Sequence, residues 1–417
     1  MSYGEVTDMG LVPNCSCYKR LCRCILMIII GLSISGCWDR LEMEDRRIVL
    51  AVAIDKADQG LEQEQRKRVS RVETFVQPHD SKRYRLSFQI LNITPSKEGA
   101  SGPRGEVGTY IVSNTGESIV EMIRDMLGQV DQSIWFEHVQ TIIISEDVVR
   151  DGGLKPILDY FRRDREMRWL TKILITSGEA RPLLEYQPPG GEPSGMFIAN
   201  SLRLYRKNSH VPGWRTDVGN AARSIDNKSR VLMARIELVD DVVKLGGMGL
   251  FKKEKFIGYV DEYAVKGGKF IGGIEKSAII TVECPDHPSK IIAFELFRHE
   301  TELTPHVEGE NIYYTLDITM RGNLGEKQCR QQHNTMDDRE IHKIEALVAQ
   351  EVKRNIFYSM HTYQDLKVDA SVLGPKLKAH EPLVWERVKE HWDDEVFPKV
   401  SLKVSVNVII ENIGGHN

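Results

Sequence analysis

The stretch Arg47-Ile-Val-Leu-Ala-Val-Ala-Ile54 consists almost entirely of β-branched and aliphatic residues. A strand built from it would be apolar on both faces, which is typical of a strand covered on both sides by other elements. We therefore expect a central β-strand here. A second strand is predicted from Tyr84 to Ile93, where Leu86, Phe88 and Ile90 alternate with polar neighbours.

Downstream of these two strands, the pattern alternates between strand and helix as far as residue 176. Strands are predicted at residues 109–113, 139–145 and 171–176, and helical segments at 117–131 and 147–165. The first helix has apolar residues at helical spacing, and Thr115 is a candidate for its N-cap. This order predicts a mixed or partly parallel sheet that is covered by helices.

A loop is predicted from Gln187 to Gly195, because the prolines and glycines of this segment do not sustain regular structure. A middle region with weaker strand and helix patterns follows, and a second block with clear strand and helix patterns begins near residue 244. In and around this block we expect strands at 231–236, 277–284, 290–298, 312–321 and 400–410, two short strands within 245–260, and helices at 337–363 and 383–392. In the last strand, the alternation predicts that Val404 and Val406 point inward while Lys403 and Ser405 point outward.

Together these patterns predict a multi-domain α/β (α+β) protein with mixed β-sheets flanked by helices. We expect an N-terminal α/β domain at residues 37–190, a middle region at 191–243 and a C-terminal α/β domain at 244–413. A chain of 417 residues is long enough for two or three domains. The formal net charge is −4 and no domain is strongly basic, so the sequence gives no support for nucleic-acid binding.

The N-terminal segment has the successive regions of a lipoprotein signal peptide. Lys19, Arg20 and Arg23 form a basic cluster, an apolar run follows from residue 25, and the run ends in Ile34-Ser-Gly-Cys37. The run is well short of the roughly 20 residues that cross a bilayer. Its last four residues resemble the bacterial lipobox, in which the cysteine thiol becomes a thioether to diacylglycerol. We therefore predict a signal peptide at residues 1–36 and lipid attachment at Cys37.

A buried N-terminal helix that happens to contain Cys37 is the alternative to the signal peptide. One feature fits the signal peptide poorly, because a polar leader from Met1 to Tyr18 precedes the basic cluster. This leader suggests a start codon assigned too far upstream.

The cysteines are distributed as expected for an exported protein. Four of the seven, at positions 15, 17, 22 and 24, lie in the segment that would be removed. Lipidation of Cys37 would leave Cys284 and Cys329, and an extracytoplasmic location permits a disulfide between them. The pairs Cys284-Pro-Asp-His287 and Cys329-Arg-Gln-Gln-His333 also form a possible zinc ligand set, although ordinary loop residues explain them better.

The other candidate motifs do not support catalysis. His299-Glu-Thr-Glu-Leu303 lacks the second histidine of a metalloprotease motif. Gly246-Gly-Met-Gly249 and Gly267-Gly-Lys-Phe270 match neither a dinucleotide fingerprint nor a phosphate loop, and we interpret them as tight turns. The mixed charges from Arg162 to Arg168 indicate a solvated helix end. We therefore predict no enzymatic activity, no catalytic residues, no cofactor and no metal.

The sequence resembles the Ger(x)C family, the lipoprotein C subunits of bacterial spore germinant receptors. The resemblance covers nearly all of residues 36–413 and rests on the order of many short segments. These segments are Gly36–Asp45, Ile48–Lys56, Thr115–Ser118, Trp135–Glu146, Ile157–Arg168, Gly249–Lys255 and Trp392–Val400 with the alternating valines after it. The segment from Asp365 to Gly374 departs from the family's pattern, because it lacks the expected aromatic and glycine residues.

This resemblance implies a non-catalytic protein of three α/β domains that is lipid-anchored on the outer face of the spore's inner membrane. It implies assembly with the multi-pass A subunit and the transporter-like B subunit of a germinant receptor, which senses nutrients and triggers germination. A solute-binding lipoprotein of a transporter is the main alternative, and it should show two similar lobes around a polar cleft. An anchored hydrolase is a weaker alternative, because the sequence offers no identifiable nucleophile or metal set.

Overall fold

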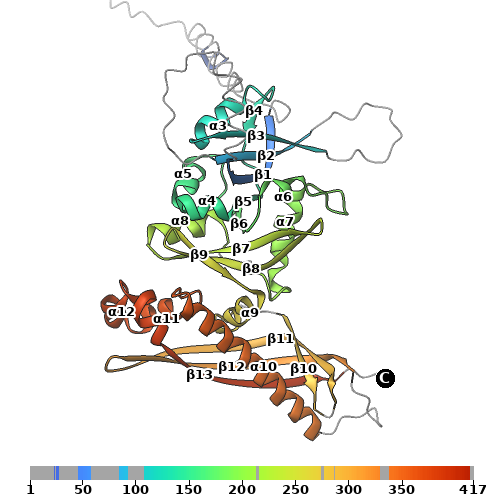
Figure 1. Ribbon diagram of the computed structural model, residues 1–417, viewed down its shortest axis with the longest axis vertical. Coiled ribbons are helices and arrows are strands. Elements are labelled where there is room, and N and C mark those ends of the chain that lie inside the picture. Colours follow the sequence, from blue (N-terminus) through green and yellow to red (C-terminus); the bar gives the residue numbers. More distant parts are fainter. Residues whose placement is uncertain are drawn as a thin grey trace, which may run out of the picture. The chain divides into compact units, whose positions relative to one another are not determined.

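The computed structural model describes residues 23, 25–27, 46–57, 84–92, 108–212, 216–273, 277–285, 287–328 and 338–413 (Figure 1). The described residues from Arg47 onward form one compact unit. Within the described ranges this unit contains two β-sheets, one of nine strands and one of four. The structure is therefore mixed α/β with two mixed sheets, as predicted.

The nine-stranded sheet has the strand order β3-β2-β1-β5-β6-β7-β8-β9, with β4 paired to β1. Its strands are β1 (Arg46–Lys56), β2 (Tyr84–Leu91), β3 (Thr109–Gly116), β4 (Ser133–Trp135), β5 (Thr141–Ser145), β6 (Lys172–Thr176), β7 (Arg230–Val239), β8 (Val242–Lys252) and β9 (Lys255–Val260). The middle strands β1, β5, β6 and β7 are parallel, while the flanking pairs are antiparallel. The prediction of a partly parallel sheet is confirmed.

Strand β1 lies between β2 and β5 and has helices on both of its faces, which explains its continuous apolar sequence. Val52 and Ile54 belong to the core beneath α3 (Ile119–Met126), α4 (Glu146–Gly152), α5 (Lys155–Arg163) and α8 (Val218–Asp226). Ala51 and Ala53 belong to the opposite core beneath α6 (Arg181–Glu185) and α7 (Ser194–Arg203). A short 3₁₀ helix, η2 (Leu204–Arg206), follows α7.

The N-cap of α3 corrects one expectation. Thr115 lies within β3, paired with Arg85, and Ser118 is the capping residue, whose Oγ accepts a hydrogen bond from the N–H of Glu121. The pairing with β2 extends β3 to Gly116, so the helix begins later than its apolar pattern suggested.

The four-stranded sheet has the order β10-β11-β12-β13, made of β10 (Ala278–Cys284), β11 (His287–Glu308), β12 (Asn311–Lys327) and β13 (Ser401–Asn412). Strand β13 runs parallel to β12, with Leu316 opposite Val404. The predicted alternation in β13 is confirmed, because Val404 and Val406 pack against the core while Lys403 and Ser405 are exposed. The Nζ of Lys403 lies 4.4 Å from the centroid of the Tyr313 ring on the solvent side.

Six helical segments accompany this sheet: α9 (Glu262–Ile271), α10 (Asp338–Asp365), α11 (Leu373–His380), α12 (Pro382–Val388), the π-helical turn η3 (Trp392–Val396) and the 3₁₀ turn η4 (Phe397–Lys399). The long helix α10 crosses the strands of this sheet obliquely (Figure 1) and contributes Ile344, Val348, Val352 and Ile356 to its core. The same core includes Leu232, Met248 and Leu250 of the nine-stranded sheet, so apolar packing is continuous between the two sheets.

Two glycine segments predicted as tight turns have other structures. Gly267 and Gly268 lie inside α9, which is capped by Asp261 and packs closely against α10. Gly247 lies within β8 at φ +76°, where its N–H donates to the carbonyl of His210, so this segment is a strand irregularity. The predicted loop at 187–195 ends earlier than expected, because Ser194 and Gly195 begin α7.

The predicted domain boundaries fall within the path of the nine-stranded sheet. Strand β8 spans the boundary at 243/244 and pairs with β7, which belongs to the predicted middle region. As separate folding units, the ranges 37–190, 191–243 and 244–413 stay a prediction.

Candidate functional site

The carboxyl ends of the parallel strands are the place where open α/β sheets commonly bind ligands. At this edge the Asp55 carboxylate, 1% exposed, accepts hydrogen bonds from the backbone N–H groups of Ala180 (2.6 Å) and Arg181 (3.0 Å). Burial raises the pKa of Asp55, and the two backbone hydrogen bonds together with nearby Arg85 oppose that rise. Asp55 thus acts as a structural link between β1 and α6.

Glu237 at the same edge is also held by neighbouring groups. Its carboxylate accepts hydrogen bonds from the Ser177 N–H (3.0 Å), the Thr176 hydroxyl (3.2 Å) and Arg235 Nε (2.9 Å). Burial alone would raise the pKa of Glu237, but the hydrogen bonds from Arg235 and Ser177 outweigh it and lower the pKa. Both carboxylates therefore serve as hydrogen-bond acceptors for the fold itself.

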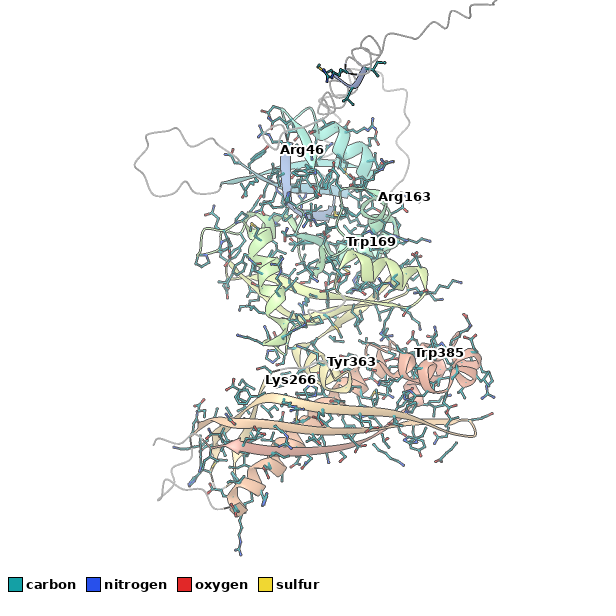
Figure 2. All side chains as sticks on the ribbon, turned by 180° about the vertical axis from the view of Figure 1, so that it is seen from behind. Arg46, Arg163, Trp169, Lys266, Tyr363 and Trp385 are labelled. Atoms are coloured by element: carbon teal, nitrogen blue, oxygen red, sulfur yellow. The ribbon has the colours of Figure 1, made fainter. Side chains whose placement is uncertain are left out.

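The most elaborate polar site is the junction between the two sheets, with α9 at its centre. Lys269 of α9 is 2% exposed, and its Nζ donates to the carbonyl oxygens of Tyr205 (2.9 Å), Asn208 (3.0 Å) and Val211 (3.3 Å). One turn earlier, Lys266 Nζ donates to the Ile279 carbonyl of β10 at 2.8 Å (Figure 2). A buried ammonium is tolerated only when its three N–H donors are paired, and Lys269 meets that condition.

The two lysines fasten α9 to different parts of the molecule. Lys269 holds the segment after η2, which leads back into the nine-stranded sheet, and Lys266 holds the four-stranded sheet. Helix α9 in turn packs against α10, where the Tyr363 hydroxyl donates to the carbonyl of Ala264 at 2.6 Å. The helix therefore couples the two sheets through both polar and apolar contacts.

A second set of polar links fixes the loop between α10 and α11. The Asp369 carboxylate, 1% exposed, accepts hydrogen bonds from the Ser371 hydroxyl (2.5 Å), the Gly374 N–H (2.7 Å) and the Trp392 indole N–H (3.2 Å). Arg230 of β7 donates to the Ser371 carbonyl. These hydrogen bonds fix the loop between α10 and α11 against β7 and η3.

The strands that reach this loop supply one further ion pair. Arg230 and Lys252 are directly opposite each other on β7 and β8, and Lys252 pairs with Asp394 of η3. Next to Asp394, the carboxylate of Asp393 accepts a hydrogen bond from the Asp369 N–H at 3.0 Å. Burial raises the pKa of Asp393, and this hydrogen bond offsets only part of the rise.

Asp393→Asn should make the protein more stable than the wild type near neutral pH. The folded state binds the Asp393 proton more tightly than the unfolded state, so the wild type loses stability as the pH rises from the usual aspartate value, near 4, to the raised pKa. Asparagine keeps an oxygen for the Asp369 N–H and does not ionise. The stability gap should widen by at most about 1.4 kcal/mol per pH unit in this window. Urea unfolding between pH 3 and pH 7 measures the gap.

Asp394→Asn is the matched control for this experiment. Its hydrogen bond from Lys252 lowers the pKa of Asp394, so its carboxylate favours the folded state above the usual aspartate pKa. This variant should therefore be slightly less stable than the wild type at pH 7. The same sign for both variants would contradict the assignment of a buried, destabilising charge to Asp393.

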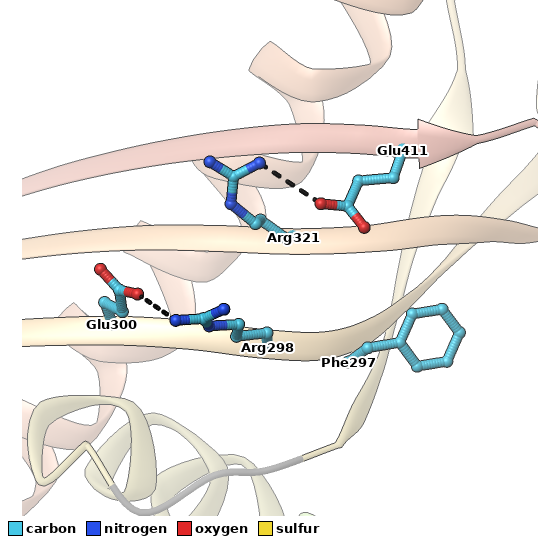
Figure 3. Close-up of a pocket in the computed structure, with 5 residues that line it drawn as sticks. All are labelled: Phe297, Arg298, Glu300, Arg321 and Glu411. Carbon is cyan, nitrogen blue, oxygen red and sulfur yellow. Dashed lines mark hydrogen bonds and ion pairs between the residues drawn. The ribbon is translucent and has the colours of Figure 1, made fainter.

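Two hollows lie on the surface of the C-terminal part. One, about 620 Å³, lies between the β11–β12 hairpin tip and the segment from α12 to η4, and its lining includes Glu310, Arg387, His391 and Lys399. The other, about 370 Å³, lies on the four-stranded sheet, where Arg321 pairs with Glu411 and Arg298 with Glu300 (Figure 3). In the second hollow these charged groups neutralise one another, and neither lining presents an activated nucleophile.

Of the residues in the predicted lipid and zinc sites, the structure describes Cys284 and His287. Cys37, Cys329 and His333 lie outside the described residues. Cys284 is disulfide-bonded at the end of β10, which removes its thiolate from the possible zinc set. In the part of the chain that the structure describes, no group of three or more His, Cys, Asp or Glu side chains could hold a metal ion. His299–Leu303 forms part of β11.

The charged segment from Arg162 to Arg168 is a solvated helix end, as predicted. Helix α5 ends at Arg163, and Arg162 forms an ion pair with Asp226 of α8. The sequence analysis did not predict Lys266 and Lys269 as a site. Their hydrogen-bond acceptors are backbone carbonyls, and those of Lys269 lie some 60 residues away in the sequence. The only sequence signal was a pair of lysines spaced one helical turn apart.

Two protein families and several known proteins are similar to this chain. Residues 39–238 match the family described as spore germination protein N-terminal domain, and residues 246–414 match the family described as spore germination B3/GerAC like, C-terminal. Spore germination protein YndF of Bacillus subtilis is 26% identical, over 95% of this chain and 97% of its own length. Spore germination protein B3 of the same organism is 22% identical over 93% of this chain and 97% of its own length.

A solved structure agrees with the fold. The crystal structure of the GerBC protein superposes with a TM-score of 0.56, covering 81% of this chain and 96% of that chain at 18% identity. The two family matches together extend from just after Cys37 to the end of β13, and the segments that carry the resemblance lie within or directly before them. The chain therefore belongs to the GerAC-like family of spore germination proteins.

Proposed function

We propose that this protein is the lipid-anchored C subunit of a nutrient germinant receptor, and that it acts by binding and assembly. The observation that carries this proposal is the start of the family match at residue 39, two residues after the cysteine of Ile34-Ser-Gly-Cys37. A folded domain that begins directly behind a lipobox is the arrangement expected of a lipoprotein's mature chain. Two or more acyl chains on Cys37 would hold it firmly at the outer face of the spore's inner membrane.

The proposed role in assembly is supported by the packing between the two sheets. The two sheets share one apolar core, and the buried groups of Lys269 and Asp369 are saturated by hydrogen bonds within the chain. A lipid anchor would confine the folded protein near integral A and B subunits and raise its effective concentration there, so modest contacts would suffice for assembly. No helix in the described ranges is both long and apolar enough to cross a membrane.

A solute-binding lipoprotein is less well supported by the architecture. Such a protein should have two similar lobes, but the two sheets differ in strand order and in the number of described strands, nine against four.

Cys37→Ala should abolish incorporation of radiolabelled palmitate and move the protein from the membrane fraction to the soluble fraction. The thiol is the only group at this position that can form the thioether. Cys24→Ala, which lies between the basic cluster and the apolar run of the predicted signal peptide, is the matched control and should keep full labelling. Undiminished labelling of the Cys37→Ala protein would refute the anchor. Spores that carry this variant should germinate poorly on nutrient while nutrient uptake is unchanged; a selective loss of uptake would favour the transporter alternative.

A further inference from the structure

An exposed apolar turn stands directly before β6. The Thr171 N–H donates to the Arg168 carbonyl at 3.1 Å, which closes a β-turn with Trp169 and Leu170 at its two central positions. Their side chains are 56% and 76% exposed. Because more than half of each residue is exposed, this pair is available for contact with another surface.

The fold holds this turn in place. The Gly219 N–H of α8 donates to the Trp169 carbonyl at 2.9 Å, and the Val218 N–H donates to the Thr171 carbonyl at 3.0 Å. The indole lies against Gly219, where an added Cβ would come within 2.9 Å of the ring carbon Cε3. Trp169 is therefore presented in a fixed orientation at the surface (Figure 2).

Two exposed arginines lie directly before the turn. Arg165 and Arg168 are exposed, and neither guanidinium has a hydrogen bond or ion pair with any described residue. The neighbouring acids bond to other groups: Asp164 accepts a hydrogen bond from the Tyr160 hydroxyl at 2.8 Å, and Glu166 accepts one from the Phe136 N–H at 3.0 Å. The turn thus combines a tryptophan, a leucine and two arginines without counter-ions in the described part of the protein.

The turn also lies at the end of the sheet where the chain enters. Strands β1, β5 and β6 are parallel, with Ala51 opposite Thr141 and Thr141 opposite Lys172. Leu170 and the first residues of β1 therefore lie at the same amino-terminal edge. Only nine residues, 38–46, separate Cys37 from Arg47, and fully extended they reach about 30 Å at ~3.3–3.6 Å each. A lipid on Cys37 would keep this edge close to the membrane surface.

We infer that the Trp169–Leu170 turn and Arg165 and Arg168 contact an anionic lipid surface and fix the orientation of the domain on it. This inference rests on the proposed lipid anchor. Tryptophan favours the interface between headgroups and acyl chains, where its ring is buried and its N–H stays hydrated. Arginines beside it are attracted to anionic headgroups. The lipid anchor confines the protein to the membrane, and the turn selects which face lies against it.

The test uses the lipidated full chain, reconstituted into phosphatidylcholine vesicles with phosphatidylglycerol and with brominated lipids that quench tryptophan emission on contact. Trp38, adjacent to Cys37, should be quenched in every lipidated sample and reports on the anchor. Trp169→Phe should remove a further quenchable component of the emission. Trp385→Phe, which removes a tryptophan from α12, should leave that component intact.

A second pair of variants tests the charges. Arg165→Glu with Arg168→Glu should abolish quenching of Trp169, whereas the equal charge change Lys378→Glu with Arg387→Glu should not. Equal quenching in the wild type and Trp169→Phe would overturn the inference, as would quenching of Trp169 without phosphatidylglycerol at the same level. If Trp169 becomes shielded from water only after integral receptor subunits are added, the inference would also be overturned, in favour of a protein contact. Loss of Trp38 quenching and of palmitate labelling together would instead refute the anchor.

Discussion

Gly267→Ala should destabilise the protein by about 3 kcal/mol or more, although glycine-to-alanine changes inside helices usually stabilise by up to about 1 kcal/mol. The new methyl group would overlap the Asn355 carbonyl oxygen and the Ser359 hydroxyl of α10. Both atoms belong to the helix that fills the core of the four-stranded sheet, so neither moves without disturbing that core. The opposite sign from the usual helical effect makes the result easy to recognise.

Chemical denaturation followed by circular dichroism measures this change in the free energy of unfolding. Gly258→Ala in β9 is the control, because nothing lies within 4 Å of the position that its Cβ would take. This control should stay within about 0.5 kcal/mol of the wild type. Wild-type stability of Gly267→Ala would mean that α9 and α10 are farther apart than the structure shows.

Lys269→Met should cost about 3–5 kcal/mol. Methionine approximates the lysine stem but supplies no donors, so the carbonyl groups of Tyr205, Asn208 and Val211 lose their common partner. Within the described residues, only the Asn208 carbonyl keeps a hydrogen bond, from the Val211 N–H. Each buried acceptor left unpaired costs about 1–3 kcal/mol. Relief of the desolvated ammonium offsets part of this loss, but removing one member of a buried polar cluster is usually the dominant effect.

Lys266→Met serves as the comparison, since its Nζ donates to the Ile279 carbonyl and its loss should cost less. Thermal melting measures both variants, and hydrogen exchange of residues 204–212 locates the damage. Protection of these amides should fall for Lys269→Met alone. If the two variants behave alike, Lys269 does not hold the segment after η2.

Strands with strong periodicity were predictable from the sequence. Three strands were predicted correctly, from the apolar run at 47–54, the alternation at 84–93 and the valines of β13. A strand that is buried on one or both faces has a regular pattern of apolar residues, and this pattern is visible in the sequence. Family membership was predictable as well, because many short segments occur in the right order behind Cys37.

Features that depend on distant contacts were not predictable. Helix α9 was missed because Gly267 and Gly268 have low helix propensity, and only the close approach of α10 explains their presence. The N-cap of α3 was misplaced by three residues because the pairing of β3 with β2 sets where the strand ends. The junction was missed because the partners of Lys269 are backbone carbonyls, which carry no side-chain signature.

The parallel pairing of β13 with β12 sets the order in which the C-terminal sheet can form. Leu316 lies opposite Val404, 88 residues later in the sequence, and helices α10, α11 and α12 intervene. Contacts between such distant residues form slowly, because a long loop must be closed before they yield any stabilisation. Until residues 401–412 arrive, β12 is an open edge that another chain could pair with. Folding of this protein therefore includes an interval in which the β10–β12 sheet is vulnerable to self-association. The interval ends when β13 pairs with β12.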